Sequence, residues 1–262
     1  MRNIDGLEGG KYVVNVTYSG DSTFTPGYKN NTNFTVSQRH WEPSITQVDY
    51  RPYGEYTTIN VTNIPNLKSR TIVIQIDGIN YTCNIVDGRA TLRLNNLSAG
   101  THNGLVLYPG DVNYQSLHKV FRPTIPQATP TITLTQDEQN NKNVIATVSG
   151  NATGKVTFFI GDKSYQVDLD GRTATLVGKL DYGTNVVSAT YGGDQNYTKA
   201  DARATFEVPQ LPSLVNVTVS DTEYGNPVEI IVQVGEGQTG SVKIEINDNT
   251  YMSELENEQA IS

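Results

Sequence analysis

The sequence predicts an all-β protein made of tandem β-sandwich domains, and three observations lead to this class. Short runs of alternating apolar and polar residues recur along the chain, separated by Gly, Asn and Asp, as in strands joined by turns. No stretch shows a persuasive helical period. One short motif occurs three times, at intervals of 90 and 83 residues, which matches one small β-domain per repeat.

The repeated motif has the form Tyr-x-Gly-Asp-x-x-aromatic. Its first defined residues are Tyr18, Gly20 and Asp21 in one copy, Tyr108, Gly110 and Asp111 in the next, and Tyr191, Gly193 and Asp194 in the last. Gly permits a tight bend, and Asp can accept N–H groups of the residues that follow it. We therefore expect a structural turn. The alternative is a Ca²⁺ or other ligand site, although one carboxylate per turn falls short of the about 6–8 oxygen ligands of Ca²⁺.

Residues 40–124 are expected to form the first complete repeat, with seven strands. Alternation and turn residues place them at 43–48, 58–62, 72–76, 81–85, 90–94, 102–108 and 119–121. The first strand follows a proline and is expected at a sheet edge. Asp77-Gly78 and Asp87-Gly88 are hairpin-turn signals, because Gly accepts a positive φ at little cost.

Residues 125–208 restate this order and are expected to form the second complete repeat. Val156, Phe158 and Ile160 should face the core, with Phe159 facing the other way. Two further landmarks recur: Asp-Gly-Arg at Asp87 and Asp170, and Leu-x-x-Gly at Leu7, Leu97 and Leu180. Landmarks that keep their order and spacing indicate tandem domains and say little about chemistry.

Each end of the chain is expected to hold part of a further repeat. Residues 1–39 correspond to the C-terminal half of a repeat, and residues 209–262 to the N-terminal half. Neither half should close a core alone, and each would expose strand edges. Two explanations stay open: the chain is a fragment of a longer array, or the terminal halves complete one another, within one chain or between chains.

The pattern Gly-x-x-x-Val-x-x-x-Tyr-x-Gly-Asp-x-x-Tyr, from Gly183 to Tyr197, resembles the end of bacterial group 3 Ig-like repeats. Phe24 replaces the last Tyr in the first copy, and Pro109 precedes the Gly in the second. Similar repeats occur in adhesin-like surface proteins of methanogenic archaea and of bacteria. The resemblance implies tandem Ig-like β-sandwich domains in an elongated array. It also implies an extracellular, cell-surface stalk or adhesion module. No enzyme activity is expected, because the sequence holds no catalytic constellation.

Composition narrows the functional classes. The net charge of −8 and the pI near 4.9 argue against a nucleic-acid partner. No apolar run approaches the about 20 residues that cross a bilayer, and the first residues show no signal peptide. Cys83 is the only cysteine, so an internal disulfide is excluded. No cofactor or metal is expected; the expected partners are neighbouring repeats of a longer chain and an unidentified surface protein or glycan.

Side chains suited to chemistry are few. His40, His102 and His118 have neither a metal-like spacing nor a repeated position, so no catalytic or ligand role is expected. Trp41, beside His40 and near Tyr50, is a candidate sugar platform, and it defines the alternative function of a carbohydrate-binding module for envelope or host glycans. Packing between domains is the simpler role for Trp41, because it occurs once and at a repeat junction.

Sequons for N-glycosylation are frequent. Asn-x-Ser/Thr occurs at Asn15, Asn30, Asn33, Asn60, Asn80, Asn96, Asn151, Asn196 and Asn216. On a secreted protein, glycans at these sites would coat the sandwiches with hydrophilic bulk. A chain rich in Asn and Thr also generates sequons by chance, and both explanations stay open.

Overall fold

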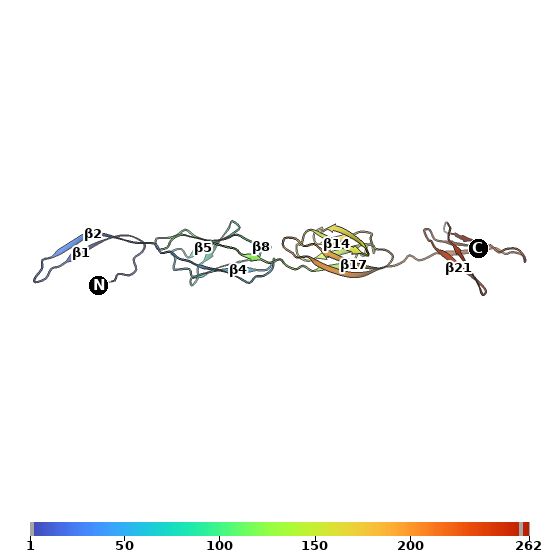
Figure 1. Ribbon diagram of the computed structural model, residues 1–262, viewed down its shortest axis with the longest axis horizontal. Helices are drawn as coiled ribbons and strands as arrows, with labels where there is room; N and C mark the ends of the chain where they lie inside the picture. Colours follow the sequence, from blue (N-terminus) through green and yellow to red (C-terminus); the bar gives the residue numbers. More distant parts are fainter. Residues whose placement is uncertain (1–2, 257–258, 262) are drawn as a thin grey trace. The chain divides into compact units, whose positions relative to one another are not determined.

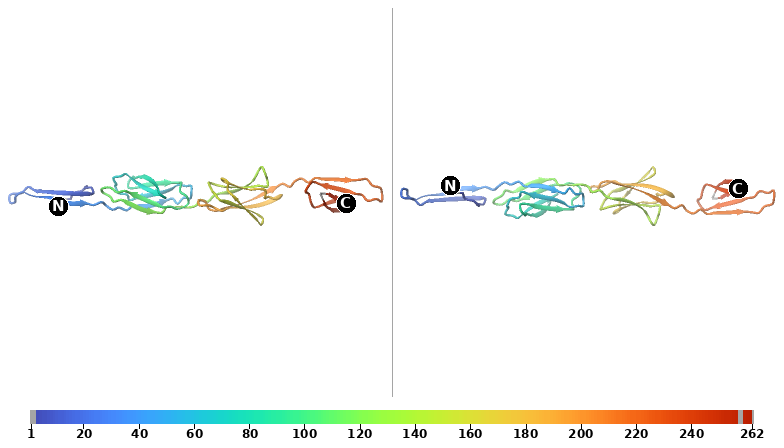
Figure 2. Two further views of the ribbon diagram at one scale, coloured as in Figure 1. Left: turned by 90° about the horizontal axis from the view of Figure 1, so that it is seen from above. Right: turned by 90° about the horizontal axis from the view of Figure 1, so that it is seen from below.

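The computed structural model describes residues 3–256 and 259–261, and every regular element in this part of the chain is a β-strand (Figures 1 and 2). The chain divides into two compact units. The first extends to Lys179 and resumes at Val186–Thr205, and the second comprises Leu180–Asn185 and the chain from Phe206 onward. The expected all-β class with tandem β-sandwich domains is confirmed.

Two sheets form between residues 40 and 124. Their strands are β3 (Ser44–Val48), β4 (Thr57–Thr62), β5 (Thr71–Ile76), β6 (Ile79–Asn84), β7 (Ala90–Leu94), β9 (Gly104–Tyr108) and β10 (Leu117–Phe121). One sheet has the order β3-β4-β7 and the other the order β10-β9-β5-β6, with antiparallel neighbours. The two-residue strands β8 (Gly100–Thr101) and β11 (Thr124–Ile125) also pair with each other.

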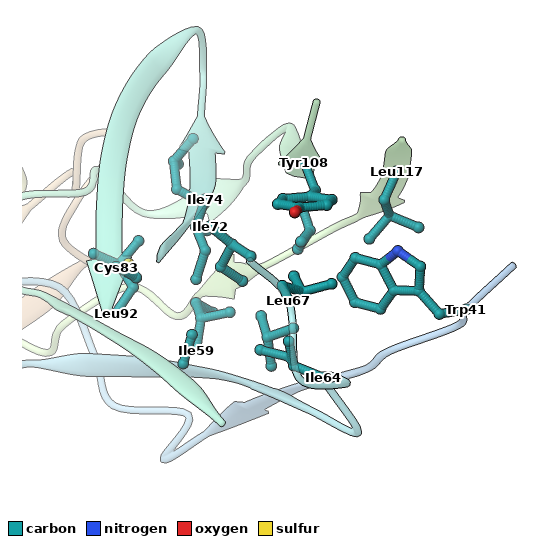
Figure 3. Packing of buried hydrophobic residues seen from close by; sticks show 14 residues of the cluster. Trp41, Ile59, Ile64, Leu67, Ile72, Ile74, Cys83, Leu92, Tyr108 and Leu117 are labelled. Atoms are coloured by element: carbon teal, nitrogen blue, oxygen red, sulfur yellow. The ribbon is translucent and has the colours of Figure 1, made fainter. Parts of the chain in front are cut away.

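The core of this repeat lies between its two sheets, because each sheet has one apolar face. Ile59 of β4, Ile74 of β5 and Val106 of β9 are at most 1% exposed, and they alternate with more exposed neighbours along each strand. Figure 3 shows Trp41 at one end of the cluster, with its indole close to Tyr108. The alternation that predicts the strands therefore also builds the core.

Residues 125–208 repeat this arrangement. The strands are β12 (Ile132–Gln136), β13 (Val144–Val148), β14 (Lys155–Ile160), β15 (Lys163–Asp168), β16 (Thr173–Leu176), β17 (Gly183–Tyr191) and β18 (Ala200–Val208). The sheet orders are β12-β13-β16 and β15-β14-β17-β18, and Figure 1 shows β14 beside β17. Val156 and Phe158 are fully buried while Phe159 is 42% exposed, which confirms the expected facing of β14.

The remaining strands form smaller sheets. β1 (Gly10–Tyr18) and β2 (Gly27–Val36) form an antiparallel hairpin. β19 (Val215–Val219), β20 (Ile230–Val234) and β23 (Gln259–Ile261) form one sheet, and β21 (Ser241–Ile246) pairs with β22 (Asn249–Glu254). Apolar side chains are exposed in both regions, such as Tyr28 at 80% and Val217 at 60%. The division into segments 1–39, 40–124, 125–208 and 209–262 stays a prediction.

The Asp-Gly turns show how local sequence and register combine. Asp77-Gly78 closes the β5–β6 hairpin with positive φ at both residues, 48° and 84°, as the sequence predicts. Asp87-Gly88 likewise lies between two paired residues. In the next repeat, however, Asp170 is itself paired, with Thr173. The residues between the paired positions are therefore Asp87-Gly88 in one repeat and Gly171-Arg172 in the other, a shift of one residue within the same Asp-Gly-Arg sequence. The pairing of the strands fixes this register.

Candidate functional site: the repeated turn

The repeated turn has the same hydrogen bonds in all three copies. One carboxylate oxygen of the Asp accepts the N–H groups of the second and third residues after it, at 2.7 and 2.8 Å. The donors are Thr23 and Phe24 for Asp21, Asn113 and Tyr114 for Asp111, and Asn196 and Tyr197 for Asp194. The Asp N–H in turn donates to the carbonyl of the aromatic residue. The Asp is thus a structural clamp on its own turn.

The glycine before each Asp is required for two reasons. Gly110 and Gly193 have φ of 87° and 82°, in the left-handed region that residues with a Cβ rarely adopt. A Cβ on Gly110 would also lie 2.9 Å from the Ser116 nitrogen, and one on Gly193 would lie 3.0 Å from the Tyr197 oxygen. The turn therefore excludes any larger residue at this position.

The tyrosine that opens the motif differs in its partner. Tyr18 and Tyr108 donate to the second carboxylate oxygen of their own Asp, at 2.6 and 2.5 Å. Tyr191 instead donates to the carbonyl of Thr153 at 2.8 Å, while Asp194 accepts the N–H and hydroxyl of Thr153. Tyr108 and Tyr191 are at most 2% exposed, whereas Tyr18 of the hairpin is 46% exposed. The ring is therefore buried in the sandwiches that contain β9 and β17 and exposed in the β1–β2 hairpin.

Hydrogen bonding and burial shift the titration of this group of residues. Burial alone would raise the pKa of Asp111, but donation from the Tyr108 hydroxyl and three backbone N–H groups outweighs it and holds the pKa at about 2. Burial and then the adjacent carboxylate raise the pKa of Tyr108 to about 12. Burial and the charge of Asp194 likewise raise the pKa of Tyr191 to about 12. The turn favours an ionised Asp beside a neutral Tyr.

The turn also holds the segment that leads into its own repeat. Arg39 exchanges two backbone hydrogen bonds with the second turn, through the Asn113 carbonyl at 2.7 Å and the Gln115 N–H at 3.1 Å. Ala128 does the same with the third turn, through Asn196 and Thr198, both at 2.9 Å. The motif therefore ties the segments before β3 and β12 to the last strand pair of the same sandwich.

A glutamine accompanies this contact in both repeats. Gln38 Nε2 donates to the Asp111 carbonyl, and Gln127 Nε2 donates to the Asp194 carbonyl at 2.8 Å. Sequence reasoning missed these residues, although Gln210 stands 83 residues after Gln127 and completes a recognisable series. The signal was a single glutamine directly before the residue that pairs with each turn.

A second set of equivalent residues pins the loop of the Leu-x-x-Gly pattern. Tyr12 Oη, His102 Nε2 and Asn185 Nδ2 each lie 2.7–2.8 Å from the carbonyl oxygen four residues earlier. His102 is 7% exposed, and its Nδ1 lies 2.6 Å from Asp77 Oδ2. The hydrogen bond from His102, followed by that from the Asn103 N–H, lowers the pKa of Asp77. One structural position therefore accepts Tyr, His or Asn.

Trp41 is not the exposed aromatic platform that a sugar site needs, and this corrects the sequence-based expectation. It is 6% exposed, packs edge-on against Tyr108 at 5.9 Å between ring centroids, and donates its Nε1–H to the Gln115 carbonyl at 3.1 Å (Figure 3). It is also not a packing residue between domains, because it belongs to the core of its own repeat. The carbohydrate-binding alternative loses the residue on which it was based.

The sequon asparagines lie in two kinds of environment. Asn15, Asn30, Asn33, Asn80, Asn96, Asn151 and Asn216 are exposed, and Asn60 and Asn196 are half-buried. Exposure alone does not leave the amide free, because Asn151 Nδ2 donates to the Tyr53 hydroxyl at 3.0 Å. Asn196 Oδ1 accepts the Ala99 N–H at 2.9 Å. These two sequons are built into protein contacts.

The structure gives little support to a catalytic or metal-binding role for the remaining candidate residues. Within the described ranges, no group of three or more His, Cys, Asp and Glu side chains is placed to hold a metal ion. His40 contacts Glu42 at 3.4 Å on the surface. Cys83 is 6% exposed in β6, and burial raises the pKa of its thiol. Residues 3–256 and 259–261 contain no helix that is long and apolar enough to cross a membrane.

Comparison with known proteins gives only remote likeness. No family model matches this chain, and no curated protein matches it. The fibronectin(III)-like modules of Clostridium thermocellum CbhA are similar with a TM-score of 0.26 and 13% identity, over 64% of this chain and 95% of that chain. The chicken CNTN1 FN1-FN3 domains have a TM-score of 0.24 and 7% identity, over 72% of this chain and 75% of that chain. The fold assignment rests on the strand order of this chain.

Proposed function

We propose that these repeats form a non-catalytic stalk or adhesion segment of an extracellular, cell-surface protein. The observation that carries this proposal is how the repeated turn is used. In each copy the Asp binds the backbone of its own turn, and in both complete repeats the turn ties the start of the sandwich to its last strands. A motif that recurs once per domain and serves the fold suits a chain that adds length domain by domain.

Three further features support this proposal. The motif from Gly183 to Tyr197 resembles group 3 Ig-like repeats of adhesin-like surface proteins. Asn96 and Asn216 are exposed sequon residues that could carry glycans on a secreted protein. The net charge of −8 would oppose self-association of many copies on one surface. Its partners would be neighbouring repeats of a longer chain and an unidentified surface protein or glycan.

Small-angle X-ray scattering tests the stalk role. A compact domain of 262 residues has a radius of gyration of about 18 Å. We expect a radius of at least about 30 Å for the full chain, because a stalk keeps successive domains apart. A radius near that of a compact domain would contradict the proposal.

Antibody labelling tests the location. Antibodies against this segment should stain intact cells of the producing organism, and brief protease treatment of those cells should remove the signal. An antibody against a cytoplasmic protein is the control for cell integrity. Staining that needs permeabilised cells would contradict a surface location.

A further inference from the structure

The same hydrogen bond joins a turn to the preceding repeat in two places. Asn113 Oδ1 accepts the N–H of Gly9 at 2.8 Å, and Asn196 Oδ1 accepts the N–H of Ala99 at 2.9 Å. Gly9 and Ala99 are equivalent, since each stands directly before the Gly of a Leu-x-x-Gly pattern. Asn113 and Asn196 are equivalent as the second residue after the clamping Asp. All four residues belong to the first compact unit.

Both sides of this contact are held in place by their own repeat. The backbone N–H of Asn196 is bound by Asp194 at 2.7 Å, which fixes the residue that presents the accepting amide. On the other side, His102 lies 2.8 Å from the Ser98 carbonyl and holds the loop that presents the Ala99 N–H. Groups that are ordered before they meet lose little conformational entropy on binding. Both sides of the interface are therefore preorganised.

Around this shared bond, the remaining contacts differ between the two interfaces. In one, Tyr53 packs edge-on against Tyr197 at 5.5 Å between ring centroids and accepts a hydrogen bond from Asn151. In the other, Lys68 pairs with Glu8 at 2.7 Å. A chance contact would not recur at equivalent residues while its surroundings change. The asparagine bond is the common element.

The first interface also explains a glycine. A Cβ on Gly9 would lie 1.8 Å from the Val112 carbonyl oxygen, so only glycine permits this close approach of the two segments. Gly9 has no positive φ that would otherwise require glycine. Ala99 occupies the equivalent position in the second interface, which therefore tolerates a methyl group. Gly9 is a residue of the interface, not of its own loop geometry.

We infer that the repeated turn is a binding surface for the Leu-x-x-Gly loop of another copy of the same repeat, with the Asn side chain as its specific acceptor. The partner is a β-sandwich repeat that offers one backbone N–H from a pinned loop. Asn113 and Asn196 then hold consecutive repeats in one fixed orientation. This inference concerns the orientation of repeats and stands independently of where the protein acts.

Amide exchange and residual dipolar couplings of the full chain test this inference. In the wild type, one alignment tensor should describe residues 40–124 together with residues 125–179 and 186–205, all of which belong to the first compact unit. In Asn196→Ala the two segments should need different tensors, and the Ala99 N–H should exchange about fivefold faster or more, because it loses its acceptor. Asn141→Ala, on an exposed turn of the same repeat, is the matched control and should keep one tensor.

The outcomes separate cleanly. Separate tensors in the wild type would overturn the inference, and so would one shared tensor in Asn196→Ala. Unfolding of either repeat is not expected in the variant, since the Asn196 side chain binds only across the interface among its described contacts. Fluorescence of Trp41 and the chemical-shift dispersion of residues 125–208 check that both sandwiches stay folded.

Discussion

Replacing Asp111 by Ala tests whether the turn carboxylate stabilises its sandwich. Asp111 accepts four hydrogen bonds, from the Tyr108 hydroxyl and from three backbone N–H groups at 2.7–3.0 Å. Tyr108 is 2% exposed, so its hydroxyl cannot readily form a replacement hydrogen bond to water. Leaving this hydroxyl without its acceptor costs about 1–3 kcal/mol of folding free energy. The three N–H groups are nearer to solvent and together add about 1–2 kcal/mol. We expect a loss of about 3 kcal/mol in the free energy of unfolding of this repeat.

Urea unfolding followed by tryptophan fluorescence measures this loss in the right repeat. Trp41 is the only tryptophan of the chain, and it packs in the same core as Tyr108. With a denaturant dependence of about 1–1.5 kcal/mol per molar urea, the unfolding midpoint should fall by about 2–3 M. The fluorescence signal reports the 40–124 repeat without contributions from the other sheets.

Asp21→Ala provides a matched control. Asp21 makes the same clamp in the first copy of the turn, but it lies outside the Trp41 core. This variant should leave the Trp41 midpoint unchanged. A shift below about 0.5 M in Asp111→Ala would show that water replaces the carboxylate, and the reasoning about the clamp would be wrong.

Three further predictions follow from the same contacts. The pKa of Asp111 is about 2 in the folded protein and 3.8 ordinarily, so its contribution to the free energy of unfolding is complete above about pH 4 and is lost as the pH falls from about 4 to 2. The urea midpoint of Trp41 fluorescence should therefore fall over that pH range, and it should fall less in Asp111→Asn. His102→Asn should cost about 1 kcal/mol, since an amide can keep the Ser98 contact, as Asn185 does at the equivalent position, but loses the hydrogen bond to Asp77; His102→Leu loses both and should cost about 2–3 kcal/mol by urea unfolding with far-ultraviolet circular dichroism. Trp41→Ala should cost about 3–5 kcal/mol because it empties a core site. This variant has no tryptophan, so its urea unfolding is followed by far-ultraviolet circular dichroism, and an unchanged midpoint would contradict core packing.

Strand positions and the turn could be predicted from sequence because they depend on neighbouring residues. The alternation of apolar residues along β4 or β14 reflects the two faces of a strand, whatever lies opposite. The clamp of Asp194 on Asn196 and Tyr197 spans three residues, so Gly-Asp followed by an aromatic was a sufficient signal. Local spacing also placed the Asp77-Gly78 hairpin.

The role of Trp41 could not be predicted, because a single tryptophan at a repeat boundary can be a core residue, a packing residue between domains or an exposed binding platform. Its burial depends on Tyr108 and Leu117, which follow it by more than sixty residues and come from β9 and β10 of the four-stranded sheet. The different partner of Tyr191 has the same origin, since Thr153 approaches it from another loop. Such pairings exist only once two sheets have packed face to face.

By itself, the sequence determined the class of fold, the order of the strands and the glycine and aspartate of each turn, because these follow from chain geometry over a few residues. Only the tertiary structure decided which side chains the turns present and to what. Asn113 and Asn196 were unspecified positions of the motif, and they acquire a role when Gly9 or Ala99 of the preceding repeat lies within hydrogen-bonding distance. A hydrogen bond across 97 residues or more depends on the packing of whole domains, and no local pattern encodes that distance.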